Sequence, residues 1–231
     1  MSDIPLIITE AEAPIADIIL AHGSGVAADS SPMTAYAQVL ASAGLRVFRF
    51  DFSYMAARKE GRRPPPPRAD KLVSEYLAAI QALPQRPGGR PLLLAGKSLG
   101  CRVAALLLGQ SEQHASLPAV AGLVCFGYPF HPPKQPEKSR LQTLLEVPVP
   151  ALVLQGERDE FGARAEVETY PLAANISLHW ATDGDHSLVP RKRSGTTFEE
   201  NIAAAAKAVA ASAKDNEERD LPLLMMIASL L

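Results

Sequence analysis

Cysteine is scarce in this 231-residue chain, and so is any surplus of charge. The two cysteines, Cys101 and Cys125, are too few for a disulfide framework. Both adjoin apolar residues typical of strands and helices, so we expect reduced and buried thiols. The formal net charge is only −2, which argues against nucleic-acid binding as the main activity because such binding needs a basic face.

Long apolar runs are also missing. No stretch approaches the roughly 18 residues that span a bilayer, so we expect no membrane span. The first residues, Met1–Pro5, contain neither a basic segment nor a long apolar one, and a secretory signal peptide needs both. We therefore expect a cytoplasmic protein. With 47% hydrophobic residues, the chain can bury the core of a single domain.

A regular alternation of two patterns runs along the chain. Short apolar runs predict strands at Leu6–Thr9, Asp17–Ala21, Arg46–Asp51, Leu92–Ala95, Gly122–Phe126, Ala151–Gln155 and Ser177–Trp180. Amphipathic segments predict helices near 33–43, 70–83, 99–110, 139–146, 163–169 and 196–213. This alternation indicates an α/β fold of three layers, with a mostly parallel sheet of about seven strands and helices on both faces. Such a sheet binds ligands beyond the carboxyl ends of its strands.

Two proline-rich connections interrupt the alternation. Residues 53–68 either receive an acidic substrate group or form a solvated loop, and a solvated loop is the commoner use of such a charge run. Residues 128–138 are too short for a lid domain, so we expect them to form an edge of the pocket. The basic residues of the first connection are Arg58, Lys59, Arg62, Arg63 and Arg68.

The last segment, residues 215–231, is first charged and then apolar. A free end of this kind would expose an apolar patch. We therefore expect it to dock on the core or on another subunit, and docking on another subunit would give a homodimer. Residues 1–214 are expected to form the single domain, without a large cap.

The most informative motif is Gly96-Lys97-Ser98-Leu99-Gly100, which lies between an apolar run and a helical pattern. This is the GxSxG nucleophile elbow in its expected setting, where a strand-to-helix turn exposes a serine for attack on a carbonyl. The glycines lie where strand and helix approach so closely that a Cβ would clash. The alternative for Ser98 is an ordinary helix N-cap.

The same residues also resemble the end of a phosphate-binding P-loop, GxxxxGK[ST]. The position that needs the first glycine of that motif is Pro91, and Leu92–Ala95 are apolar. A P-loop without its first glycine lacks the bend that wraps the phosphates. We therefore interpret the segment as a buried strand followed by the elbow.

A serine nucleophile needs a base and a carboxylate, and the chain supplies both downstream. Asp159 follows the predicted strand Ala151–Gln155, and His186 lies in a glycine-containing loop after Ser177–Trp180. Ser98, Asp159 and His186 occur in the order serine, acid, histidine that this architecture uses. The alternative for His186 is a surface histidine in a polar loop. Other acids lie near Asp159 and His186, namely Glu157, Glu160, Asp183 and Asp185.

A fourth element, His22-Gly23-Ser24-Gly25, follows an apolar strand. In this fold a His-Gly-x-Gly turn supplies one backbone N–H of the oxyanion hole, and the residue after the nucleophile supplies the other. We expect the donors to be the N–H groups of Ser24 and Leu99. His22 is expected to hold the turn in place, together with Gly23 and Gly25; the alternative is a plain glycine turn.

Taken together, these motifs resemble the α/β-hydrolase superfamily over roughly residues 4–213. The run Cys125–Pro133, Gln155–Asp159 and Gly184–Ser187 resemble more closely a group of small, cap-poor predicted hydrolases. The eukaryotic relatives of that group include a subunit of a histone acetyltransferase complex. The resemblance implies the triad Ser98, Asp159 and His186, and it also implies that such a fold can be kept as a scaffold. One departure is Glu160, where the pattern has proline.

The expected function is that of a serine hydrolase acting on a small-molecule ester or thioester with a small or exposed acyl group. We expect no metal and no cofactor. The alternative is a catalytically silent interaction or scaffold protein that retains the fold.

Overall fold

A computed structural model describes residues 4–84, 89–110 and 117–228, with side chains up to residue 214. Its centre is a seven-stranded sheet with the order β1-β3-β2-β4-β5-β6-β7. All neighbouring pairs are parallel except β1 and β3. All seven predicted strands are confirmed. The strands are β1 (Ile7–Thr9), β2 (Ala16–Ala21), β3 (Leu45–Phe50), β4 (Leu92–Lys97), β5 (Gly122–Phe126), β6 (Ala151–Gly156) and β7 (Ile176–Ala181).

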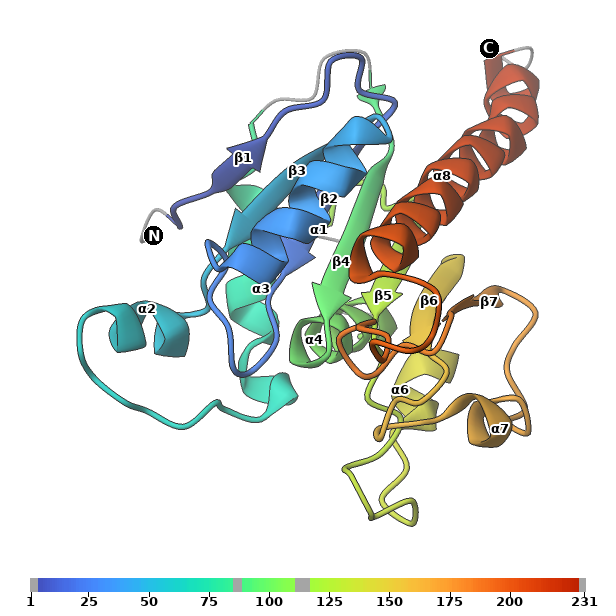
Figure 1. Cartoon of the computed structure of the whole chain (residues 1–231). Helices are drawn as coiled ribbons and strands as arrows, with labels where there is room; N and C mark the ends of the chain where they lie inside the picture. Colours follow the sequence, from blue (N-terminus) through green and yellow to red (C-terminus); the bar gives the residue numbers. More distant parts are fainter. Residues whose placement is uncertain (1–3, 85–88, 111–116, 229–231) are drawn as a thin grey trace.

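Helices cover both faces of the sheet, which confirms the predicted three-layer α/β-hydrolase fold (Figure 1). The side chains of α1 (Ser31–Ser42) and α8 (Phe198–Ala228) form one core with one face. Those of α3 (Val73–Gln81), α4 (Leu99–Gly109) and α6 (Leu141–Leu145) form the other core. The central strands read as continuous apolar runs because both of their faces are covered. Within the described ranges, no large cap interrupts the sheet and its helices.

One helix was not predicted. Residues 53–68, interpreted as a loop, begin with α2 (Ser53–Lys59), which buries Tyr54, Met55 and Ala57. The helix is only two turns long, and the basic residues and the four prolines that follow obscure its short apolar pattern. A single 3₁₀ turn, η1 (Ala69–Lys71), then leads into α3. The prediction is wrong for 53–59, while the rest of the connection lacks regular structure as expected.

The final helix is longer than predicted. It runs without interruption from Phe198 to Ala228, so the predicted tail at 215–231 continues the helix as far as the structure describes it. Residues 229–231 lie outside the described part. Figure 1 shows this end of α8 extending beyond the sheet. A homodimer formed through this segment stays a prediction. Over the described ranges, no helix has both the length and the apolarity needed to cross a membrane.

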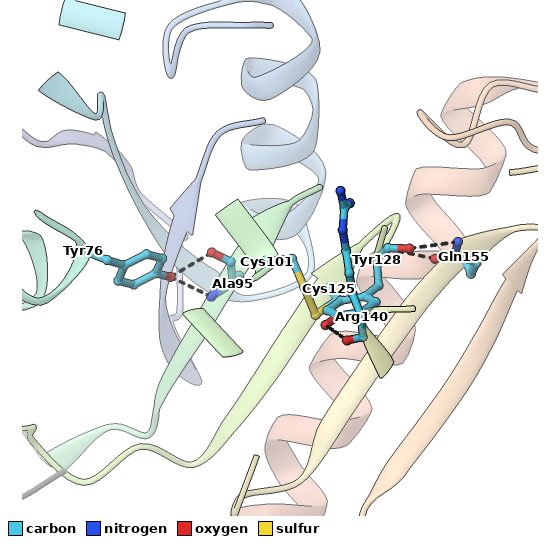
Figure 2. The surroundings of a disulfide bond; sticks show 7 residues. All are labelled: Tyr76, Ala95, Cys101, Cys125, Tyr128, Arg140 and Gln155. Atoms are coloured by element: carbon cyan, nitrogen blue, oxygen red, sulfur yellow. Dashed lines mark hydrogen bonds between the residues drawn. A yellow bond between two sulfur atoms is a disulfide. The ribbon is translucent and has the colours of Figure 1, made fainter. Parts of the chain in front are cut away.

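The two cysteines form a disulfide, contrary to the expectation of reduced thiols (Figure 2). Cys101 lies in the first turn of α4 and Cys125 lies in β5, with their Cα atoms 5.2 Å apart. Gly96 is the Cα partner of Cys125 in the β4–β5 register, and a Cβ on Gly96 would come within 2.2 Å of the Cys101 nitrogen. The close approach of helix and strand therefore brings the sulfurs together. The expectation of reduced thiols is therefore wrong, and the cytoplasmic location stays a prediction.

Candidate active site

Ser98 lies in a sharp turn between β4 and α4. Its φ and ψ angles are +52° and −107°, a conformation that costs a non-glycine residue energy and is retained where the surrounding structure enforces it. A Cβ on Gly96 would lie 2.2 Å from backbone atoms of α4, and one on Gly100 would lie 2.5 Å from the Ala21 carbonyl oxygen. Both glycines are therefore required on steric grounds, as the motif predicts.

The structure brings the three predicted residues into one hydrogen-bonded chain. The Oγ of Ser98 lies 2.8 Å from Nε2 of His186, and Nδ1 of His186 lies 2.8 Å from Oδ2 of Asp159. Asp159 is fully buried, whereas the His186 side chain is 19% exposed. A hydroxyl, an imidazole and a carboxylate in this series can move a proton from the hydroxyl to the imidazole while the carboxylate holds the ring.

Three of the four competing acids have other partners. Asp183 forms ion pairs with Arg158 and Arg191, and the bond to Arg191 lowers the pKa of this carboxyl. Asp185 accepts hydrogen bonds from backbone N–H groups of its own loop. Glu157 pairs with an arginine of α7 (Arg164–Val167). Of the candidate acids, Asp159 is the one whose carboxylate meets His186.

Two side chains that hold the Ser98–His186–Asp159 hydrogen-bond series in place were not predicted. The Nε2 of Gln155 donates to Oδ2 of Asp159 over 2.8 Å, so the last polar residue of β6 orients the carboxylate. The Phe161 ring lies against the His186 ring with centroids 4.1 Å apart, and its N–H donates to the other carboxylate oxygen. The sequence did contain one sign of this role for Gln155: it is a polar residue at the end of an otherwise apolar predicted strand.

Lys97 is a buried cation directly behind the site. Lys97 is only 7% exposed, and its Nζ donates to the carbonyl oxygen of His186 over 2.6 Å. Burial lowers the pKa of Lys97 to about 8, against an opposing effect of the negative charges of Asp159 and Asp185. In the sequence this lysine drew notice only through the P-loop likeness. The structure places it where it holds the loop that carries His186.

The turn at 22–25 packs against the elbow. His22 is buried, and its Nε2 accepts a hydrogen bond from the Phe52 N–H while Nδ1 lies 2.7 Å from the Gly23 carbonyl oxygen. Nδ1 therefore carries the proton and donates to Gly23. Burial lowers the pKa of His22, consistent with this neutral ring. These contacts tie the turn to the start of α2, as expected of His22.

Helix α2 holds the same turn from the other side. Tyr54 donates its hydroxyl hydrogen to the Gly23 carbonyl, and Arg58 donates to the Ser24 carbonyl, over 3.3 and 3.2 Å. The two expected oxyanion donors lie beside Ser98: Ser24 and Leu99 line the same cavity as the serine. Leu99 is the first residue of α4. The N–H groups of the first helical turn have no acceptor within the helix, so the Leu99 N–H is free of helical hydrogen bonding.

The two glycines of this turn are less constrained than predicted. A Cβ on Gly23 would make ordinary contacts of 3.5 Å with Lys97, and one on Gly25 would meet nothing within 4 Å. Neither residue has a left-handed φ. Steric need therefore explains Gly96 and Gly100, but it does not explain Gly25.

A cavity of about 440 Å³ opens in front of Ser98. Both proline-rich connections contribute to it, through Pro66, Pro67 and Arg68 on one side and Pro129 on the other. The remaining wall comes from Ser24, from Ala69 and Asp70 of η1, from α4 and from the segments around Arg140 and Phe161. The expectation that residues 53–68 and 128–138 frame the pocket agrees with this lining.

A family model described as an alpha/beta hydrolase domain matches residues 14–214. The match covers most of the chain and includes every residue of the hydrogen-bonded site. The narrower resemblance to relatives of a histone acetyltransferase subunit stays a prediction.

Several solved structures are similar to this chain. An alpha-beta serine hydrolase homologue from Coxiella burnetii is 16% identical, with a TM-score of 0.62 and 89% of each chain covered. A serine hydrolase without a lid from Xanthomonas campestris is 19% identical, with a TM-score of 0.61, covering 91% of this chain and 88% of that one. The protein Est1E from Butyrivibrio proteoclasticus, solved with ferulic acid, is 14% identical, with a TM-score of 0.64 and coverages of 92% and 96%. At these identities the likeness shows the fold.

Proposed function

The chain belongs to the alpha/beta hydrolase domain family, and on that premise we propose that it is a serine hydrolase that cleaves carboxylic ester or thioester bonds. The observation that carries the proposal is the series of 2.8 Å hydrogen bonds from Ser98 through His186 to Asp159. A scaffold protein would have no use for this series beside two candidate oxyanion donors and an open cavity.

In the first half of the reaction, Ser98 Oγ attacks the carbonyl carbon while Nε2 of His186 accepts the hydroxyl proton. Asp159 accepts the hydrogen bond from Nδ1 and stabilises the imidazolium. The N–H groups of Ser24 and Leu99 donate to the oxyanion of the tetrahedral intermediate. Loss of one such donor typically lowers turnover by about 10² to 10³. His186 then protonates the leaving group, and an acyl-enzyme remains.

In the second half, His186 removes a proton from water, which attacks the acyl-enzyme, and Ser98 recovers its proton as the acid departs. The His186 side chain is 19% exposed, so water can reach it. Short connections line that cavity, and the part of the chain that the structure describes contains no lid domain. Both features support substrates with a small or exposed acyl group.

The test combines a fluorophosphonate probe with turnover of p-nitrophenyl acetate. We expect the wild type to be labelled and to hydrolyse the ester, and we expect Ser98→Ala to lose both properties. His186→Ala should lose turnover to a similar degree because the serine then lacks its base. If the folded wild type neither labels nor exceeds these variants in rate, the chain is a non-catalytic member of the family and the proposal is wrong.

A further inference from the structure

The cavity in front of Ser98 carries two arginines that the proposed reaction does not use, Arg102 and Arg140. Among residues whose side chains the structure describes, neither guanidinium forms an ion pair with a carboxylate. Half-buried arginines are normally paired, because removing a charge from water is costly. Two of them on the wall of one cavity therefore call for an anion.

Arg102 lies one helical turn after the elbow. Its backbone N–H donates to the Ser98 carbonyl over 3.2 Å, so the helix fixes its position relative to the serine. The side-chain Nε is buried and has no hydrogen-bond partner in the described part of the chain. A buried donor without a partner costs stability. Because Nε itself is shielded, the part of the Arg102 side chain that can meet a ligand is the outer end of the guanidinium, on the cavity wall.

Arg140 reaches the same cavity from the end of the 128–138 connection. The Tyr128 hydroxyl donates to its carbonyl over 2.9 Å, which anchors the backbone beside the disulfide (Figure 2). Its guanidinium makes one long bond, 3.5 Å, to the Pro129 carbonyl. Burial, and then the positive charge of Arg102, lower the pKa of Arg140. The two guanidinium charges therefore repel each other, and an anion between them would relieve that repulsion.

The basic residues of the connection at 53–68, for which the sequence left open a solvated loop or a receptor for an acidic group, largely have partners already. Lys59 pairs with Asp29 and Asp51, and Arg62 pairs with Glu60. The guanidinium of Arg58 donates to two backbone carbonyls. Arg68 lies at the rim of the cavity but is already paired with Asp70. The unpaired positive charge at the site belongs instead to α4 and to the segment before α6.

We propose that Arg102 and Arg140 bind a carboxylate at the far end of the substrate's acyl group, so that the preferred substrate is a half-ester of a short dicarboxylic acid. This inference rests on the proposed hydrolase function and names its substrate class. Guanidinium groups bind carboxylates in a planar, two-pronged geometry. Arg102 follows Ser98 by one helical turn and lines the same cavity, so the carboxylate site lies close to the nucleophile, which favours a short diacid.

The test compares two esters that differ in charge but hardly in size: p-nitrophenyl hemiglutarate, with a free carboxylate, and p-nitrophenyl methyl glutarate, in which that group is a methyl ester. We expect kcat/KM of the wild type to be at least about tenfold higher for the charged ester. Arg102→Gln and Arg140→Gln should each lower this ratio by about 10- to 100-fold, and lysine at either position should restore part of it.

The matched control is Arg193→Gln, which removes an equal charge from an exposed position outside the cavity lining. It should keep both the ratio and the activity of the wild type. If the wild type hydrolyses the neutral ester and shows no preference, or if the ratio is unchanged in both cavity variants, the inference is wrong while the proposed function stands.

A binding measurement that needs no turnover tests the anion site even if the protein proves not to be a hydrolase. Calorimetry with the Ser98→Ala protein would measure binding of monomethyl glutarate, and dimethyl glutarate would serve as the neutral control. We expect the charged ligand alone to bind, and its affinity to fall at least tenfold when Arg102 or Arg140 is also changed to Gln. Binding of this kind in an enzyme that fails the fluorophosphonate test would support the anion site and contradict the hydrolase. Equal binding of both ligands would overturn the anion site.

Discussion

The two sides of Ser98 are built differently. Behind it, toward the sheet, Gly96, Gly100 and the Cys101–Cys125 disulfide leave no space, and the buried Lys97 already donates to the loop of His186. In front of it, the cavity wall holds Arg102 and Arg140, and in the turn beside Ser24 a Cβ on Gly25 would meet nothing within 4 Å. Behind the serine, groups pack against one another, whereas the two arginines in front have no carboxylate partner among the described side chains and are proposed to bind a ligand.

This difference suggests which property each side controls. A change behind Ser98 should mainly lower the free energy of unfolding, because the close-packed atoms cannot relax. A change in front should mainly alter turnover or selectivity, because the fold loses little. The predictions below test the division, beginning with a residue that is buried and still expected to act in catalysis.

Asp159→Asn is expected to break the division. Asp159 is fully buried, yet the loss should appear in kcat, by about 10⁴-fold, because an amide cannot stabilise the imidazolium and favours the wrong tautomer of His186. Thermal unfolding of the same sample would show that the variant is folded. A variant that is folded and as active as the wild type would remove Asp159 from the proposed mechanism.

Gly96→Ala is expected to lower the free energy of unfolding by about 4 kcal/mol or more, since the added Cβ would meet backbone atoms that cannot move independently. The matched control is Gly25→Ala, where a Cβ meets nothing within 4 Å and the expected change is below about 0.5 kcal/mol. Denaturant unfolding measures both values. Equal losses at the two glycines would contradict the contrast between the two sides of the serine.

The strand pattern was predictable because buried parallel strands are continuous apolar runs, such as Leu92–Ala95. The order of Ser98, Asp159 and His186 was likewise visible, since each follows a predicted strand or lies in a loop after one. The sequence pattern could not show how closely neighbouring helices and strands pack against each other. Cys101 and Cys125 both looked buried, but their contact depends on how closely α4 approaches β5 at Gly96.

The same limit explains the unpredicted supports of the site. Lys97 and Gln155 end apolar strands, and a sequence pattern does not say which loop a strand end will face. Arg102 lies in a helix whose periodicity was clear, but the missing carboxylate partner is a property of the folded surroundings. Helix α2 escaped notice because its three buried side chains are flanked by charge and proline.

Replacement of both cysteines, Cys101→Ala with Cys125→Ala, is expected to lower the free energy of unfolding by about 3 kcal/mol. The bond closes a loop with a sequence separation of 24, and a loop of this size restricts the unfolded chain by roughly that amount. A reducing agent should shift the wild-type transition toward that of the variant and leave the variant unchanged. If thiol titration of the unfolded, unreduced protein finds two free thiols, the cysteines are reduced, as the sequence suggested.

Lys97→Met is the smallest of these effects and the one with a characteristic pH dependence. Burial lowers the pKa of Lys97 from 10.5 to about 8, so the unfolded chain binds this proton more tightly than the folded protein does. The cost of burying the charged amine is therefore fully present below pH 8, and stability of the wild type rises as the pH increases from about 8 to 10.5. The variant lacks this rise.

At pH 7 we expect Lys97→Met to be more stable than the wild type by about 2 kcal/mol, with the advantage disappearing toward pH 10.5. Turnover should nevertheless fall, because His186 loses the hydrogen bond to its carbonyl oxygen. Lys192→Met, at an exposed position, should show neither change. A constant difference in unfolding free energy across this pH range would mean that Lys97 titrates normally. In that case burial of the charged Lys97 amine would not lower the free energy of unfolding, and the lysine would contribute through packing alone.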